Sequence, residues 1–325
     1  MGPIPRSLLV CVTFHYVPSR LRYLATIAAE FPSLAERTKV VIITNDSSAH
    51  DSITAALSPL GLDLEILTPT LLGHPYLLAW CHKDIFRREY ERESNEYSHY
   101  LYTEDDLLIC KQNVNYWMES RELLKPSGLI PSFIRYEINP YSQLEVSTDL
   151  EAKVNPAKAP KIFFPDLNYA YISLPNPYQG TYLFDRDLLA EHFESILRYG
   201  PEAPAPDGWI YTREKAALGA TFCKVPYGFS SRNVVGYQID AQRVDMRSLI
   251  HHTPNNYAGN PNSQYGELPI CDLISPPIFL PKKPAKRHIR RDGSFLQLPR
   301  PSLREYLKSI LKKITLTPPL ELYQT

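Results

Sequence analysis

The stretch YLYTEDDLLI, residues 100–109, carries an aromatic and apolar run directly into three consecutive acidic residues. Tyr100 to Tyr102 predicts a short strand, and Glu104, Asp105 and Asp106 follow at the point where that strand ends. Open α/β sheets bind ligands outside the carboxyl ends of their strands, where loops and helix N-termini converge. We therefore predict a sheet strand followed directly by a polar binding site.

Strand and helix patterns alternate before this stretch, which favours βαβ units and a largely parallel sheet. Apolar or β-branched runs predict strands over residues 8–14, 39–44 (KVVIIT) and 62–68. Helical patterns predict helices over residues 19–30, 52–57 and 75–93. The first third of the chain is thus expected to be an α/β unit that ends in the acidic cluster.

The alternation weakens after Gln112, and residues 138–161 are expected to form loops or hairpins. Helical patterns return over residues 187–198 and 207–218. Beyond Pro276 the chain is rich in proline and basic residues, which predicts an extended tail.

The tail ends in an amphipathic pattern over residues 303–314, preceded by a capping box of Ser302 and Glu305. The apolar face of this helix could dock on the protein's own core, which is the more frequent use of such a face. Alternatively, it could make a peripheral contact with a membrane surface.

Composition excludes several classes of protein. Lysine plus arginine (35) equals aspartate plus glutamate (35), so no global field draws the chain toward nucleic acid. The five cysteines form no CxxC pair, which favours a reducing, cytoplasmic setting. The apolar residues 8–14 are too few for a membrane span, and we expect neither export nor a transmembrane anchor.

The P-loop, GxGxxG and GxSxG motifs are absent from the sequence, which argues against the common nucleotidases, dinucleotide enzymes and serine hydrolases.

Clustered carboxylates repel one another unless a cation lies between them, and oxygen ligands of this kind suit Mg²⁺ or Mn²⁺. The natural companion of such a cation is a diphosphate. A solvated turn or a helix cap would explain the same three residues without any ligand. The residues Glu104 to Asp106 alone do not distinguish a metal site from a solvated turn or a helix cap. The motifs that follow them along the chain are needed for that distinction.

Four short motifs occur in a defined order over about residues 7–260. The acidic run Tyr102 to Asp106 is followed by the glycine-bearing Asn176 to Thr181, by Pro206 to Trp209 with Asp207 at a helix start, and by Leu249 to His252. This order resembles the GT-A glycosyltransferases, whose DXD motif would here carry glutamate in place of the first aspartate.

The resemblance implies a GT-A-like, Rossmann-related mixed sheet flanked by helices, with an irregular acceptor half. One catalytic domain would then span residues 1–275, with its nucleotide-sugar half at about 1–125 and its acceptor half at about 126–275. Residues 276–325 would form the basic tail. The implied activity is hexosyl or pentosyl transfer from a nucleotide-diphosphate sugar, with Mn²⁺ or Mg²⁺, onto a glycan or glycolipid hydroxyl, for example in polysaccharide assembly.

Metal ligation is predicted for Asp106, with Glu104 reaching a metal-bound water or the ribose. His251 and His252 are adjacent, so on a strand they point to opposite sides and only one can meet the metal. We favour His252. A hydrogen-bonded structural histidine is the alternative. The polar run Thr253 to Tyr257 is expected to close over phosphate.

The general base is predicted to be Asp207, which a helix dipole would keep ionised, and such a base favours inversion. A plain helix cap explains Asp207 equally well. Glu214, further along the same helical pattern, is the second candidate. Arg135 and Glu137 would share one face of a strand, either as an ion pair with each other or as acceptor ligands.

The donor site is predicted to include residues at the ends of the first two strands, the acidic run and the glycine loop. These residues are Thr13, His15, Arg20, Asn45, Asp46, Glu104, Asp105 and Gly180. A non-catalytic carbohydrate- or nucleotide-binding protein would use the same positions, and it is the main alternative. A metal-dependent phosphoesterase would use histidines and aspartates dispersed over many strand ends, whereas here the acidic cluster is single.

Overall fold

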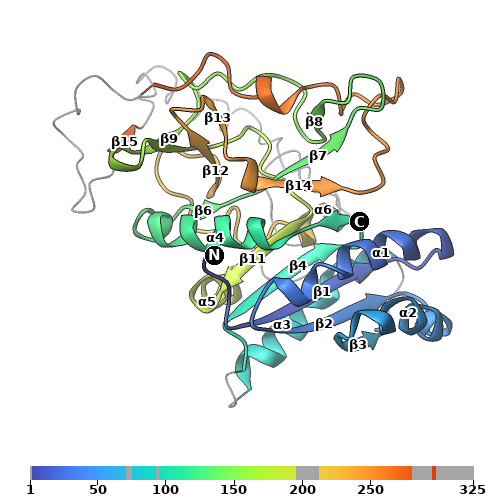
Figure 1. Cartoon of the computed structure of the whole chain (residues 1–325). Coiled ribbons are helices and arrows are strands. Elements are labelled where there is room, and N and C mark those ends of the chain that lie inside the picture. Colours follow the sequence, from blue (N-terminus) through green and yellow to red (C-terminus); the bar gives the residue numbers. More distant parts are fainter. Residues whose placement is uncertain (1, 71–74, 93–95, 195–211, 280–294, 298–325) are drawn as a thin grey trace, which may run out of the picture.

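The computed structural model describes residues 2–70, 75–92, 96–194, 212–279 and 295–297. It is a mixed α/β protein of parallel and antiparallel strands flanked by helices, which confirms the predicted fold class. Figure 1 shows the first sheet in the lower half of the molecule and the remaining strands in the upper half, with helix α4 between them.

The first sheet has five strands in the order β11-β4-β1-β2-β3. Its strands are β1 (Ser7–Phe14), β2 (Arg37–Thr44), β3 (Asp63–Leu67), β4 (His99–Glu104) and β11 (Thr181–Asp185). All pairs are parallel except β11 with β4. The residues from Leu8 to Val12 are fully buried, as expected for a parallel strand covered on both faces.

Three helices connect these strands: α1 (Leu21–Ala28), α2 (His50–Leu57) and α3 (Cys81–Glu91). The helix expected over residues 75–93 begins as a 3-10 turn at Pro75–Trp80 and continues as α3. The predicted alternation of strands and helices in the first third of the chain is confirmed.

Helix α4 (Lys111–Leu124) corrects the expectation that regular structure weakens after Gln112. Its buried face includes Val114, Trp117, Arg121 and Leu124, which recur at helical spacing. Polar residues within this stretch obscured the pattern, because Asn113 and Arg121 are themselves buried.

The upper half contains two further sheets. One has the order β13-β12-β10-β9-β15, with β6 paired to β12, and the other has the order β5-β14-β7-β8. Their strands are β5 (Leu107–Leu108), β6 (Ile130–Pro131), β7 (Ile134–Ile138), β8 (Glu145–Ser147), β9 (Lys161–Phe164), β10 (Tyr169–Ile172), β12 (Asn233–Gln238), β13 (Arg243–Val244), β14 (Leu249–His252) and β15 (Phe295–Gln297). Residues 138–161 were expected to form loops or hairpins, and their first part forms the turn and second strand of the β7–β8 hairpin.

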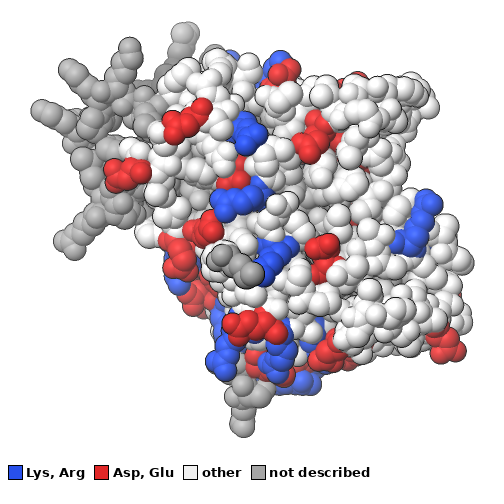
Figure 2. Space-filling model, viewed as in Figure 1, with Lys and Arg blue, Asp and Glu red and all other residues white. Residues whose placement is uncertain are grey.

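The remaining helices are α5 (Arg186–Glu194) and α6 (Thr212–Ala216), which fall within two predicted helical patterns. Ala217 and Leu218, at the end of the second pattern, form a turn instead of helix. Residues 195–198 and 207–211 of those patterns, the basic cluster of the tail and the amphipathic pattern over 303–314 lie outside the described residues. Among the helices that the structure describes, none combines the length and apolar character needed to cross a bilayer. On the face seen in Figure 2, basic and acidic side chains of the described residues are interspersed.

The short strand β5 joins the two halves at the acidic cluster. Glu104 ends β4 in the first sheet, and Leu107 begins β5, which pairs antiparallel with β14 so that Leu107 lies opposite His252. The acidic residues therefore form the turn between two sheets, and the register of β5 against β14 brings His252 to that turn.

Asn113 holds the N-terminus of α4 against this region, and we predict that Asn113→Ala destabilises the fold. Its side-chain amide donates to the carbonyl oxygens of Arg247 (2.8 Å) and Leu249 (2.7 Å), and its oxygen accepts from the amide of Cys110 (2.8 Å). Because these backbone groups would lose their partners, the free energy of unfolding in urea should fall by about 2 to 4 kcal/mol. Gln112→Ala, at an exposed position of the same helix, should change it by less than about 0.5 kcal/mol. Equal effects of the two variants would contradict this role.

Candidate active site

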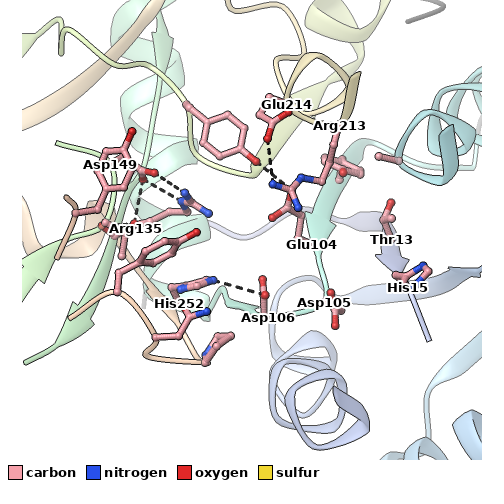
Figure 3. A pocket seen from close by; sticks show the side chains of 18 of the residues that line it. Thr13, His15, Glu104, Asp105, Asp106, Arg135, Asp149, Arg213, Glu214 and His252 are labelled. Atoms are coloured by element: carbon pink, nitrogen blue, oxygen red, sulfur yellow. Dashed lines mark hydrogen bonds and ion pairs between the residues drawn. The ribbon is translucent and has the colours of Figure 1, made fainter. Parts of the chain in front are cut away.

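A cavity of about 750 Å³ opens beside the acidic turn. The first sheet and the residues that follow its strands contribute Thr13, His15, Arg20, Glu104, Asp105 and Asp106 to its wall. The opposite wall is formed by residues from the upper half and α6, among them Arg135, Asp149, Tyr178, Arg213, Glu214, His252 and Tyr257 (Figure 3). The cavity thus lies where the ends of β1 and β4 face the second half of the chain.

Arg20 neutralises part of the charge of the turn. Its guanidinium donates from Nε and Nη2 to both oxygens of Asp105 and from Nη2 to Oδ2 of Asp106, each at 2.8 Å. Burial raises the pKa of Asp105 to about 7, although the bond to Arg20 acts in the opposite direction. The sequence predicts a metal ion as the counter-charge of these carboxylates. The structure shows that the guanidinium of Arg20 also supplies positive charge to them.

His252 approaches the turn from the other side. Its Nε2 lies 3.5 Å from Oδ2 of Asp106, and its Nδ1 lies 2.6 Å from Oε1 of Glu137. Burial lowers the pKa of His252, but the two carboxylates outweigh this effect and bring it to about 9. Burial likewise raises the pKa of Asp106, yet His252 and Arg20 together lower it to about 2. The pair is therefore an ion pair in the protein without a cation.

Asp106 and His252 fit a divalent cation as two of its ligands. Oδ1 of Asp106 is buried and accepts no hydrogen bond from any described residue, and Nε2 of His252 faces the same carboxylate. Within the described ranges, no three or more His, Cys, Asp or Glu side chains are arranged to hold a metal ion. Cations such as Mg²⁺ are commonly bound through one or two carboxylates, with substrate phosphates and waters completing the shell. A cation bound to Asp106 and His252 would likewise need phosphate oxygens of a substrate and water molecules to complete its coordination shell.

Glu104 has its own partner in the cavity wall, Tyr178. Its Oε1 accepts from the hydroxyl of Tyr178 at 3.0 Å, and in Figure 3 its carboxylate lies beneath Arg213. Burial and the neighbouring Asp106 raise the pKa of Glu104, while Arg135 and Arg213 act to lower it. Glu104 and Asp106 therefore have different partners in the cavity.

Gly180 lies against Glu104, but it is not itself among the residues that line the cavity. Its φ is +63°, and a Cβ built at this position would lie 3.2 Å from Oε2 of Glu104 and 2.9 Å from Cδ1 of Leu107. Glycine is required both by the left-handed backbone and by the close approach of these side chains.

Asp149, Tyr178 and Arg213 line the cavity, but the sequence patterns assigned them no role. Arg135 binds both oxygens of Asp149, with 2.9 Å from Nε to Oδ2, and its guanidinium lies over the ring of Tyr178. Arg213 pairs with Glu214 at 3.0 Å. Residue type alone gave no signal for Asp149, Tyr178 or Arg213.

Other predicted residues are placed as follows. Thr13, His15 and Glu214 line the cavity, whereas Asn45 and Asp46 do not. Oδ1 of Asn45 accepts from the amide of Tyr16 (2.7 Å), and Asp46 caps a short 3-10 helix by accepting from the amide of Ser48 (2.8 Å). Asp207 lies outside the described residues.

The two histidines diverge as expected: His252 faces Asp106, and His251 stacks on Tyr136 with ring centroids 5.2 Å apart. Arg135 and Glu137 both lie on β7, but of the two alternatives that the sequence left open, the ion pair between them does not form. Each has its own partner, Asp149 for Arg135 and His252 for Glu137.

We predict that Gly180→Ala destabilises the protein more than Gly61→Ala. Both glycines have φ of +63°, but a Cβ at Gly61 would meet nothing within 4 Å. Gly61→Ala should therefore lower the free energy of unfolding by about 1 kcal/mol, and Gly180→Ala by about 2 to 4 kcal/mol, because the added methyl also displaces Glu104 or Leu107. Urea denaturation measures both values. Equal losses would show that the contact with Glu104 is not tight.

Comparisons with known proteins give only distant matches. No family model matches the chain, and no curated protein sequence does. Among solved structures, the chain is similar to glucosyl-3-phosphoglycerate synthase from Mycobacterium tuberculosis in complex with Mn²⁺, UDP-glucose and phosphoglyceric acid, with 14% identity, TM-score 0.32 and coverage of 57% of this chain and 59% of that chain. It is also similar to residues 1–349 of S. aureus TarS, with 13% identity, TM-score 0.33 and coverage of 66% and 56%. The chain thus covers less than two thirds of these structures, and a function has to be argued from the residues of the cavity.

Proposed function

We propose that the cavity binds a nucleotide-diphosphate sugar together with Mn²⁺ or Mg²⁺ and transfers the sugar to a hydroxyl of a glycan or glycolipid. The observation that carries this proposal is the pair of Asp106 and His252 at a strand end, with Oδ1 of Asp106 buried and lacking a partner among the described residues. A cation held there would stabilise negative charge developing on the diphosphate leaving group.

The residues of the acidic turn and their neighbours would each bind a different part of the donor. Arg20 holds Asp105 and Asp106 in place and keeps Asp106 ionised, as a ligand must be. Glu104 is held by the hydroxyl of Tyr178 and would accept hydrogen bonds from ribose hydroxyls of the donor. Thr13 and His15 line the same donor side.

Deprotonation of the acceptor hydroxyl needs a carboxylate on the opposite wall. Glu214 lines the cavity, its Oε1 is held by Arg213, and its Oε2 is buried and accepts no hydrogen bond from the described residues. These features support Glu214 as a base. Asp207 remains the candidate favoured by sequence, and either residue would serve an inverting reaction.

Turnover should depend on Asp106. A panel of nucleotide-sugars with Mn²⁺ should contain at least one donor that raises the melting temperature and is slowly hydrolysed. Asp106→Asn should lower the rate on the order of 10²-fold, because the neutral amide is a poorer cation ligand. Asp51→Asn, an exposed change on α2, should leave the rate unchanged. Donor binding without any turnover would favour a non-catalytic binding protein of the same fold, and no stabilisation by any donor would overturn the proposal.

The two candidate bases can be separated by their effects on transfer. The variant that removes the true base, Asp207→Asn or Glu214→Gln, should lower kcat by about 10² to 10⁴-fold with donor affinity retained. Transfer to an acceptor and binding of the donor are measured side by side for each variant. If neither variant lowers kcat, inversion assisted by either carboxylate is excluded.

A further inference from the structure

Glu137 is a fully buried carboxylate surrounded by N–H donors. Its Oε1 accepts from Nδ1 of His252 (2.6 Å) and from the amide of Asn256 (3.1 Å). Its Oε2 accepts from the amides of Tyr257 (2.8 Å) and Ala258 (2.6 Å). These four donors satisfy both oxygens, which explains why a carboxylate is tolerated in this interior position.

The donors belong to two parts of the cavity wall. One is the ring of His252, and the others are backbone amides of the loop that follows it, from Thr253 to Ala258, which we call the cavity loop. Thr253 at its start donates from its amide (2.9 Å) and its hydroxyl (3.0 Å) to the carbonyl oxygen of Asp106. Asn256 and Tyr257 line the cavity. Glu137 therefore ties the histidine and the cavity loop to one rigid strand, β7.

An ionised carboxylate only accepts hydrogen bonds, so Nδ1 of His252 must carry its proton toward Glu137. Nε2 is then the nitrogen that faces Asp106 and that would meet a cation. Hydrogen bonding of the distal ring nitrogen to a carboxylate commonly sets both the tautomer and the orientation of metal-binding histidines, and it raises their basicity.

We propose that Glu137 is a positioning residue, which sets the orientation and tautomer of His252 for a divalent cation and holds the cavity loop in place beside it. This inference rests on the proposed function for the presence of the cation, but it concerns a residue that need not touch substrate or metal. Nothing in the sequence pattern assigns this role, since Glu137 is equally suited to an ion pair with Arg135 on the same strand.

Glutamine cannot replace Glu137 fully. Four N–H donors bind the two carboxylate oxygens of Glu137, whereas the glutamine side chain has only one oxygen. In Glu137→Gln, the amide group must turn its own N–H donors either toward His252 and Asn256 or toward Tyr257 and Ala258. Affinity for Mn²⁺ should fall by about 10- to 100-fold, as is usual when such a partner is lost. Glu145→Gln on β8 is the matched control, since it makes the same change on the same hairpin outside the cavity wall.

The test measures Mn²⁺ binding by electron paramagnetic resonance on the full chain, with Mn²⁺ alone and with Mn²⁺ plus UDP. Spin-echo modulation reports whether a nitrogen nucleus is bound to the metal. The variants are Glu137→Gln, His252→Ala and both together, with thermal melting as a check of folding. Glu137→Asp, which retains the charge, replaces Glu137→Gln where that variant does not fold, and it should bind Mn²⁺ more weakly than the wild type.

Four outcomes are distinguishable. The inference predicts nitrogen modulation in the wild type, weaker binding in Glu137→Gln and no further loss when that change is added to His252→Ala. An unchanged affinity and modulation in Glu137→Gln would overturn the role of Glu137 and leave the proposed function standing. Further loss in the double variant would show that Glu137 acts on the fold rather than through His252. Absence of Mn²⁺ binding or of nitrogen modulation in the wild type would overturn the cation site itself.

Discussion

The contact between His252 and Asp106 depends on the pairing of two short strands from distant parts of the chain. β5 follows the acidic turn directly, and it lies antiparallel to β14, the strand that ends in His252. Without this register the turn would face only the first sheet and Arg20. Because alternate residues on a strand point to opposite faces, a slip of one residue would present His251 to Asp106 instead. Asn113 supports the same register from α4 by binding the carbonyl of Leu249 at the start of β14.

The electrostatics of the turn also follow from this pairing. Two acidic side chains that are almost fully buried would be costly without counter-charges, and the structure supplies Arg20 on one side and His252 on the other. The fold therefore does not require a cation for the turn to form. A divalent cation bound at Asp106 would displace the proton that His252 otherwise holds there, so metal binding and proton release are linked at this site.

Local sequence patterns predicted the α/β unit well, because its strands are continuous apolar runs and its helices have clear apolar faces. The order of motifs, through its resemblance to GT-A glycosyltransferases, singled out the acidic turn, Gly180 and His252, and in the structure Gly180 lies beside Glu104 and His252 beside Asp106. Helix α4 was missed since buried polar residues such as Asn113 interrupt its apolar pattern. For Arg135 the sequence left an ion pair with Glu137 and contacts with an acceptor both open, and it gave no signal for Asp149, the partner that lies on another segment. Such partners are decided by tertiary packing, which no local pattern contains.

The acidic cluster, which is a single motif in the sequence, makes three different sets of contacts in the fold. Asp105 forms an ion pair with Arg20, Asp106 faces His252, and Glu104 accepts a hydrogen bond from the hydroxyl of Tyr178. Since the strand ends at Glu104 and the chain turns at Asp105 and Asp106, the three carboxylates point in different directions. The clustering of acidic residues is therefore not in itself a metal cage. Only Asp106 combines a buried oxygen that lacks a partner among the described residues with a facing histidine, and that histidine is in turn held by Glu137. The direction of each side chain, more than the number of charges, decides where a cation can bind.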